Sequence, residues 1–150
     1  MRRFWAALLA LFVLAALPAS AGPGIFEELT IVTKAGSHRF SVEVMRSPED
    51  RMRGMMFRRE LAPDKGMLFT QDQVGPASFW MKNTYVSLDI LFIREDGIIH
   101  RIEKATEPLS TTPILSGAPV LGILEILAGT SDKLGIAPGD RVEHSLFKSP

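Results

Sequence analysis

Turn-forming residues divide the chain into short apolar segments, and this spacing limits the possible folds more than any other feature. Gly, Pro, Asn and Asp interrupt the apolar segments about every 8–15 residues. Such spacing predicts a mainly β, single-domain protein, either a compact β-sandwich or a half-open barrel of about eight short strands. One or two short helices are expected, near 48–54 and 131–134. The predicted strands include 29–33, 40–44, 67–70, 88–93, 98–102, 120–127 and 141–145.

The segment 47–54 has the residues of a short helix. Ser47 can cap its first turn, and Asp50 stands three residues later, as in a capping box. Gly54 is expected to end or bend the helix. Three methionines would share one face of it, at spacings of three and four residues; they are Met52, Met55 and Met56. By contrast, the segment 107–119 has three prolines and is expected to be a long loop that could border a site.

The N-terminus resembles a secretory signal. Arg2 and Arg3 precede an unbroken apolar run over 4–17, and Ala19 and Ala21 offer the small residues that signal peptidase reads. The run is shorter than the ~20 residues of a membrane-spanning helix, which disfavours a permanent anchor. We therefore expect 1–21 to be a cleaved signal peptide and 22–150 one globular domain. Export by the general secretory route would leave the protein periplasmic or secreted, with no stable membrane anchor.

Charge and composition exclude several classes of protein. The full chain has 17 Lys and Arg and 17 Asp and Glu. Cleavage would remove Arg2 and Arg3 and no acid, so the net charge of the mature chain would be −2. No nucleic-acid partner is expected, because such proteins carry a concentrated basic excess. The chain has no cysteine, which excludes disulfides, a lipid-modified cysteine and a thiol nucleophile.

Polar side chains within apolar segments mark the candidate site. On a strand, Asp89 would share a face with Leu91 and Ile93. Burying an unpaired carboxylate is costly, so partners are required. We expect Asp89 to form a partly buried network with Lys82 and Asn83 beside Trp80. That network could be a ligand pocket or an acid–base site, or it could be structural and hold the loop 82–88 to the sheet.

A second carboxyl group repeats this pattern. Glu125 would share a face with Ile123 and Leu127, and we expect a structural pairing with Arg53 or Arg51. No catalytic residue is assigned. The candidate binding residues are Arg53, Trp80, Lys82, Asn83, Asp89 and Glu125.

Metal chemistry has weaker support. Thioethers could hold Cu(I), a soft ion, but methionine is also a good filler of irregular cores. We expect neither a metal site nor a cofactor. The methionines in question are Met45, Met52, Met55, Met56, Met67 and Met81; the histidines, His38, His100 and His144, are widely separated and expected at the surface.

Four arginines cluster around the predicted helix. They could meet an anionic lipid head group or glycan, although pairing with the local acids Glu49, Asp50 and Glu60 is the simpler expectation. The cluster consists of Arg51, Arg53, Arg58 and Arg59.

Several ordered motifs resemble the DUF192 family. They are 51–56, 66–69, 79–84, 88–93, Asp96-Gly97, Leu124-Glu125, Gly129 and Gly139-Asp140. The departures are small: Met55 stands where the family often has Leu, and Tyr85 where it often has Ile. The resemblance implies a compact, mostly β domain that is often exported. It implies no activity, since none is assigned to the family.

The leading functional hypothesis is therefore a non-enzymatic periplasmic or secreted β domain. It would bind a small ligand or an envelope partner through the region from Trp80 to Asp89. One alternative is an envelope hydrolase that uses Asp89 as acid or base, with Lys82 or Asn83 stabilising developing charge. A second alternative is a methionine-based Cu(I)-binding protein.

Overall fold

A computed structural model describes residues 25–147, so the predicted signal peptide and its cleavage site lie outside the described residues. Within this range no helix is long and apolar enough to cross a membrane. The secondary structure of residues 25–147 comprises nine strands and two short helices. They are β1 Phe26–Thr33, β2 Gly36–Met45, α1 Pro48–Arg53, β3 Lys65–Gly75, β4 Ser78–Phe79, β5 Leu88–Ile93, β6 Ile99–Glu103, β7 Ile114–Leu115, β8 Val120–Leu127, α2 Thr130–Leu134 and β9 Arg141–Glu143.

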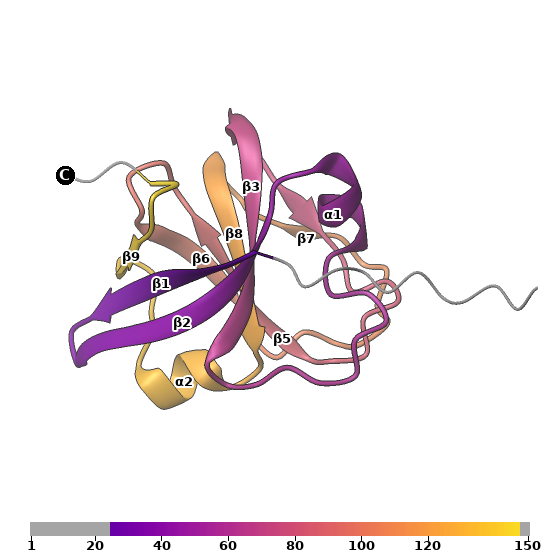
Figure 1. The fold of residues 1–150 in the computed structure, drawn as a ribbon, viewed down its shortest axis with the longest axis horizontal. Helices are drawn as coiled ribbons and strands as arrows, with labels where there is room; N and C mark the ends of the chain where they lie inside the picture. Colours follow the sequence, from indigo (N-terminus) through magenta and orange to yellow (C-terminus); the bar gives the residue numbers. More distant parts are fainter. Residues whose placement is uncertain (1–24, 148–150) are drawn as a thin grey trace, which may run out of the picture.

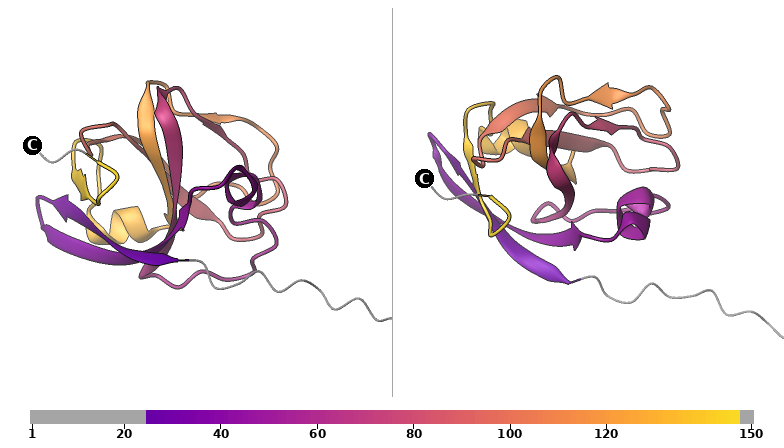
Figure 2. Two further views of the ribbon diagram at one scale, coloured as in Figure 1. Left: turned by 45° about the horizontal axis from the view of Figure 1, so that its top comes forward. Right: turned by 90° about the horizontal axis from the view of Figure 1, so that it is seen from above.

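Seven strands form one strongly curled sheet in the order β6-β5-β8-β3-β2-β1-β9 (Figures 1 and 2). Within this sheet, as far as the structure describes it, β2 and β3 pair in parallel and the other neighbours pair antiparallel. A bridge between Ile98 and Arg141 connects the two ends of the sheet, and the Val142 N–H donates to the Gly97 carbonyl at 2.8 Å. The predicted mainly β, half-open barrel is therefore confirmed.

The predicted helix is confirmed with its caps. The Asp50 N–H donates to Ser47 Oγ at 3.1 Å, and Gly54 ends the helix at a φ of 45°. Since α1 ends at Arg53, Met55 and Met56 lie in the turn that follows, not on the helix.

The proline-rich segment is more ordered than predicted. Within it, β7 pairs with β4 in a separate two-stranded sheet. The buried Ser116 hydroxyl accepts the Ala77 N–H at 3.0 Å and donates to the Ala118 carbonyl at 2.7 Å. These pairings hold the segment against the rest of the domain, so 107–119 is not the structureless loop that three prolines suggested.

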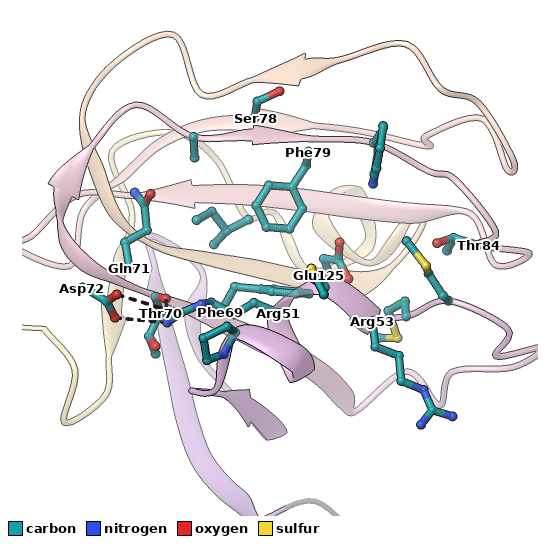
Figure 3. Close-up of a pocket in the computed structure, with 18 of the residues that line it drawn as sticks. Arg51, Arg53, Phe69, Thr70, Gln71, Asp72, Ser78, Phe79, Thr84 and Glu125 are labelled. Atoms are coloured by element: carbon teal, nitrogen blue, oxygen red, sulfur yellow. Dashed lines mark hydrogen bonds and ion pairs between the residues drawn. The ribbon is translucent and has the colours of Figure 1, made fainter. Parts of the chain in front are cut away.

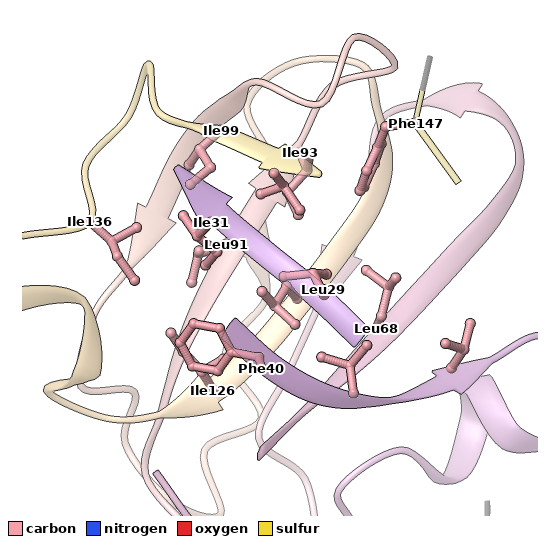
Figure 4. Close-up of a cluster of buried hydrophobic side chains, with 14 residues drawn as sticks. Leu29, Ile31, Phe40, Leu68, Leu91, Ile93, Ile99, Ile126, Ile136 and Phe147 are labelled. Atoms are coloured by element: carbon pink, nitrogen blue, oxygen red, sulfur yellow. The ribbon is translucent and has the colours of Figure 1, made fainter. Parts of the chain in front are cut away.

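The central strands are buried on both faces because two cores lie on opposite sides of them. All six residues of β5 are buried. Leu91 and Ile93 point into the curled sheet, and Ile90 and Phe92 point outward. The inner core (Figure 4) is formed by Leu29, Ile31, Phe40, Val42, Val44, Leu68, Leu91, Ile93, Ile99, Leu124, Ile126, Ile136, Val142 and Phe147. The outer core comprises Met45, Met55, Met67, Phe69, Ala77, Met81, Val86, Leu88, Ile90, Phe92, Val120 and Ile123.

Candidate functional site

A cavity of about 980 Å³ lies on the outer face of β3 and β8, beside α1 (Figure 3). We call it the α1 cavity. Its walls are largely apolar, with polar groups at the edges and one acid within. The main lining residues are Met52, Arg53, Met55, Met56, Phe69, Gln71, Asp72, Phe79, Trp80, Thr84, Ile123 and Glu125.

Glu125 is the acid inside the α1 cavity. On β8 it lies between Met67 of β3 and Ile90 of β5 in the sheet register, so its side chain is on the outer face with Ile123, as the alternation predicted. The residue is only 4% exposed. Its Oε2 atom is buried without a hydrogen-bond partner among the described residues. Figure 3 shows the carboxyl group among the residues that line the cavity.

Burial has a clear electrostatic effect on this group. It raises the pKa of Glu125 to about 8, while the positive charge of Arg58 opposes the shift. Near neutral pH the side chain is therefore mostly a neutral carboxylic acid, which can donate one hydrogen bond. Leaving a buried polar atom unpaired costs about 1–3 kcal/mol. A bound molecule with a hydrogen-bond acceptor would remove that cost.

Among residues 25–147, neither Arg51 nor Arg53 forms an ion pair with Glu125, so the predicted pairing was wrong. Arg51 contacts Asp72 at 3.2 Å and donates to the Thr70 carbonyl at 3.1 Å. Arg58 forms an ion pair with Glu43 of β2 at 2.5 Å. The acidic partners belong to strands β2 and β3 and not to the acids near α1 in the sequence, because the curled sheet brings these two strands beside the α1 region. Arg53 is exposed and lines the cavity, and Figure 3 shows its guanidinium directed outward.

Asp89 does not belong to the lining of the α1 cavity. It is fully buried on the same face as Leu91. One carboxylate oxygen accepts the Ala105 N–H at 3.0 Å, and the other accepts the Ser131 N–H at 2.9 Å. Both oxygens therefore have partners, and the carboxylate holds the segment after β6 and the start of α2 against β5. This geometry is that of a structural carboxylate.

The expected network of Asp89 with Lys82 and Asn83 is not formed. Lys82 lies over the Trp80 ring at 5.2 Å, and Asn83 Nδ2 donates to the Met56 sulfur at 3.9 Å. Among residues 25–147, neither has a hydrogen bond or ion pair to Asp89. Trp80 is 49% exposed and lies at the edge of the α1 cavity. Of the six candidate residues, Arg53, Trp80 and Glu125 line the α1 cavity, and Asp89 is a buried support. Lys82 and Asn83 do not belong to the cavity lining.

Some residues of the α1 cavity could not be selected from the sequence. Phe69 and Phe79 pack edge to face with centroids 4.9 Å apart, and together with Met55 they line its interior. In the sequence, Phe69 and Phe79 were marked only by apolar segments and by the family motifs 66–69 and 79–84, and neither signal separates cavity residues from core residues. The proline-rich loop does not border this cavity. It borders a second one of about 500 Å³ with Met81 and Arg101.

Three of the methionines considered as metal ligands lie close together, since Met52, Met55 and Met56 all line the α1 cavity. Within the described residues, no three His, Asp or Glu side chains group as metal ligands would.

The surface position predicted for His144 was wrong. Its side chain is 2% exposed and its Nε2 lies 3.1 Å from Glu27 Oε2, and burial lowers its pKa.

Comparisons with known proteins agree on the family. The DUF192 family, described as "Uncharacterized ACR", matches residues 30–144. No curated protein matches the chain. A crystal structure from Sinorhizobium meliloti, provisionally labelled a transcription regulator, is 42% identical, with a TM-score of 0.80; the match covers 83% of this chain and 97% of that one.

A crystal structure of a protein of unknown function from Novosphingobium aromaticivorans is 36% identical and also has a TM-score of 0.80. The match covers 87% of this chain and 94% of the other. Family match and structural similarity together extend over nearly all of the described domain. The chain belongs to the DUF192 family.

Proposed function

We propose that the protein is a non-enzymatic binding domain that takes up a small, largely apolar molecule in the α1 cavity. The observation that carries the proposal is the unpaired Oε2 of Glu125, buried within a cavity large enough for a ligand. Since the acid is mostly protonated near neutral pH, the preferred ligand has a carbonyl, ether or similar acceptor. Its apolar part would contact Met55, Phe69 and Phe79.

This proposal moves the site away from the position predicted from sequence. The alternative of a hydrolase that uses Asp89 loses support, because backbone amides occupy both carboxylate oxygens. A nucleic-acid ligand is not part of the proposal, since the predicted mature chain has a net charge of −2 and lacks a concentrated basic excess. Export to the periplasm or the medium remains a proposal from residues 1–21.

The test is to identify what co-purifies with the protein. The protein is isolated from the envelope fraction of its producing cells and examined by native mass spectrometry, alongside Glu125→Leu. Leucine removes the acid without leaving a buried polar atom, so this variant should fold at least as well as the wild type. Glu143→Leu is the control, because Glu143 is an exposed acid on β9 that does not line the cavity.

We expect one organic mass bound to the wild type and to Glu143→Leu but absent from Glu125→Leu. An empty wild-type protein, or equal occupancy of all three, contradicts the proposal. A bound copper ion in place of an organic molecule contradicts it as well and supports the methionine-based alternative. N-terminal sequencing of the same preparation should begin at Gly22 if export and cleavage occur as predicted.

A further inference from the structure

Exposed apolar side chains gather at one end of the domain, where three loops meet. We call this region the three-loop end and define it as residues 54–60, 80–87 and 105–113. Phe57 is 59% exposed and Leu109 is 54% exposed, and exposed apolar residues that lie together typically mark an interaction surface. Trp80 and Tyr85 are also among the exposed large apolar residues. Figure 1 shows these loops beside α1, on the opposite side from β9 and the β1–β2 turn.

Backbone hydrogen bonds hold the three loops together. The Phe57 N–H donates to the Asn83 carbonyl at 2.8 Å, and the Leu109 N–H donates to the Thr84 carbonyl at 3.1 Å. The Met81 N–H donates to the Ser110 carbonyl at 2.9 Å. The central loop thus bonds to both of its neighbours, and the exposed side chains project from one connected surface.

The backbone is strained where the apolar side chains project. Phe57 and Leu109 both have a φ of 66°, and Asn83 between them has a φ of 57°. Bulky residues rarely adopt this left-handed conformation, and such strain is typically retained at functional positions. Burial does not explain it here, because Phe57 and Leu109 are both mostly exposed. The strain therefore favours a surface that presents these side chains to a partner.

The charges at this end indicate the chemistry of the partner. Arg59 lies over the Tyr85 ring at 5.1 Å, and Lys82 over the Trp80 ring at 5.2 Å. The three loops have three cations, Arg58, Arg59 and Lys82, of which Arg58 is already paired with Glu43. The neighbouring Arg53 adds a further cation, and the acids of the loops are Glu60 and Glu107. Exposed aromatic and aliphatic side chains next to cations match the interface of an anionic bilayer, where Trp and Tyr meet head groups and Lys and Arg meet phosphates.

We propose that the three-loop end docks on a lipid membrane surface that carries anionic head groups. Phe57, Leu109, Trp80 and Tyr85 enter the interfacial region, and Lys82 and Arg59 contact the phosphates. The apolar burial and the charge attraction are separate contributions, and both are needed for stable attachment. The docking does not depend on a ligand in the α1 cavity.

The test is flotation of the protein with phosphatidylglycerol-containing vesicles, compared with pure phosphatidylcholine vesicles. The protein used begins at Gly22, because both cores are formed within residues 29–147 and the apolar segment 4–17 would itself bind lipid. Phe57→Ser and Leu109→Ser, singly and combined, remove apolar contacts without altering the cavity lining. Lys82→Gln removes one cation. Thermal unfolding verifies that each variant is folded.

We expect binding to the anionic vesicles that weakens with added salt. The double variant should lower the partition coefficient by at least about tenfold, and Lys82→Gln by about fivefold. The matched controls are Val74→Ser, an exposed apolar residue on β3, and Lys34→Gln, an exposed lysine at the β1–β2 turn. These controls and Glu125→Leu should leave vesicle binding within about twofold of the wild type.

Four results would overturn the proposal. The first is no preference for anionic vesicles, and the second is equal binding by Leu109→Ser, Lys82→Gln and the controls. The third is self-association that Leu109→Ser abolishes while vesicles stay unbound, which would assign the surface to a second copy of the chain. Loss of vesicle binding in Glu125→Leu alone would also contradict it. Because the cavity proposal is measured by bound ligand mass, either proposal can fail without the other.

Discussion

At the scale of single residues, Asp89 and Glu125 show how similar sequence contexts lead to different roles. Both acids stand in apolar strands, at neighbouring positions of the same sheet. Asp89 faces inward and accepts two backbone N–H groups. Glu125 faces outward and has a buried oxygen without a partner. Strand alternation determines the face of each acid, but the surrounding segments determine whether its oxygens are satisfied.

Asp89→Asn should lower the free energy of unfolding by about 1–3 kcal/mol, because the new amide group would face one backbone N–H and leave it unpaired. Urea unfolding measures the loss. The control is Asp132→Asn, whose exposed ion pair with Lys104 should be worth less than about 1 kcal/mol. Equal losses in the two variants would show that the buried hydrogen bonds of Asp89 contribute no more to the free energy of unfolding than an exposed ion pair does. Binding in the α1 cavity should persist in Asp89→Asn.

Glu125 should make stability fall as pH rises. Its pKa increases from 4.5 to about 8 on folding, so between these values the folded state holds a proton that the unfolded state has released. Its contribution is complete below pH 4.5 and declines by about 1.4 kcal/mol per pH unit up to about pH 8.

Urea unfolding across this pH range should show that slope as a difference between the wild type and Glu125→Gln. The comparison removes the contributions of other groups, including His144, whose pKa shifts in the opposite direction. A constant difference between the two proteins would mean that Glu125 does not change protonation on folding.

At the scale of elements, the C-terminal turn closes one end of the barrel. Phe147 packs into the inner core, and its N–H donates to the His144 carbonyl at 3.0 Å. A side-chain carbon added to Gly122 of β8 would lie 2.7 Å from the Phe147 ring. Glycine is therefore required at 122 by the close approach of an aromatic ring.

Gly122→Ala should lower the free energy of unfolding by about 1–3 kcal/mol, the usual cost of overpacking a core. In a Phe147→Leu background the same change should cost less, since the ring atoms that it would meet are gone. A double-mutant cycle by urea unfolding measures this coupling. Additive losses would show that the Phe147 ring is not what restricts position 122.

At the scale of the whole molecule, the curled sheet separates structural from candidate functional chemistry. Its inner face encloses a continuous apolar core that includes Leu91 and Leu124. Its outer face carries a second core that is incomplete beside α1, where the α1 cavity lies. The three-loop end adjoins that cavity through Trp80, so the candidate binding site and the candidate membrane surface occupy the same side of the domain.

The sequence by itself determined the local features. The bounds of β5 and β8 match the predicted 88–93 and 120–127, because apolar runs and the turn residues that bound them are local signals. Ser47 and Asp50 identified the start of α1 for the same reason. Alternation also placed Glu125 on the face of Ile123 and Asp89 on that of Leu91.

Only the tertiary structure decided which polar groups meet. Asp89 pairs with backbone amides of Ala105 and Ser131, 16 and 42 residues away, and Arg58 pairs with Glu43 on β2. Among the described residues Glu125 Oε2 has no hydrogen-bond partner, although a cluster of four arginines lies in and just after α1. The physical reason is that hydrogen bonds and ion pairs act over a few ångströms in space, and strand pairing brings together residues whose separation along the chain carries no signal of contact.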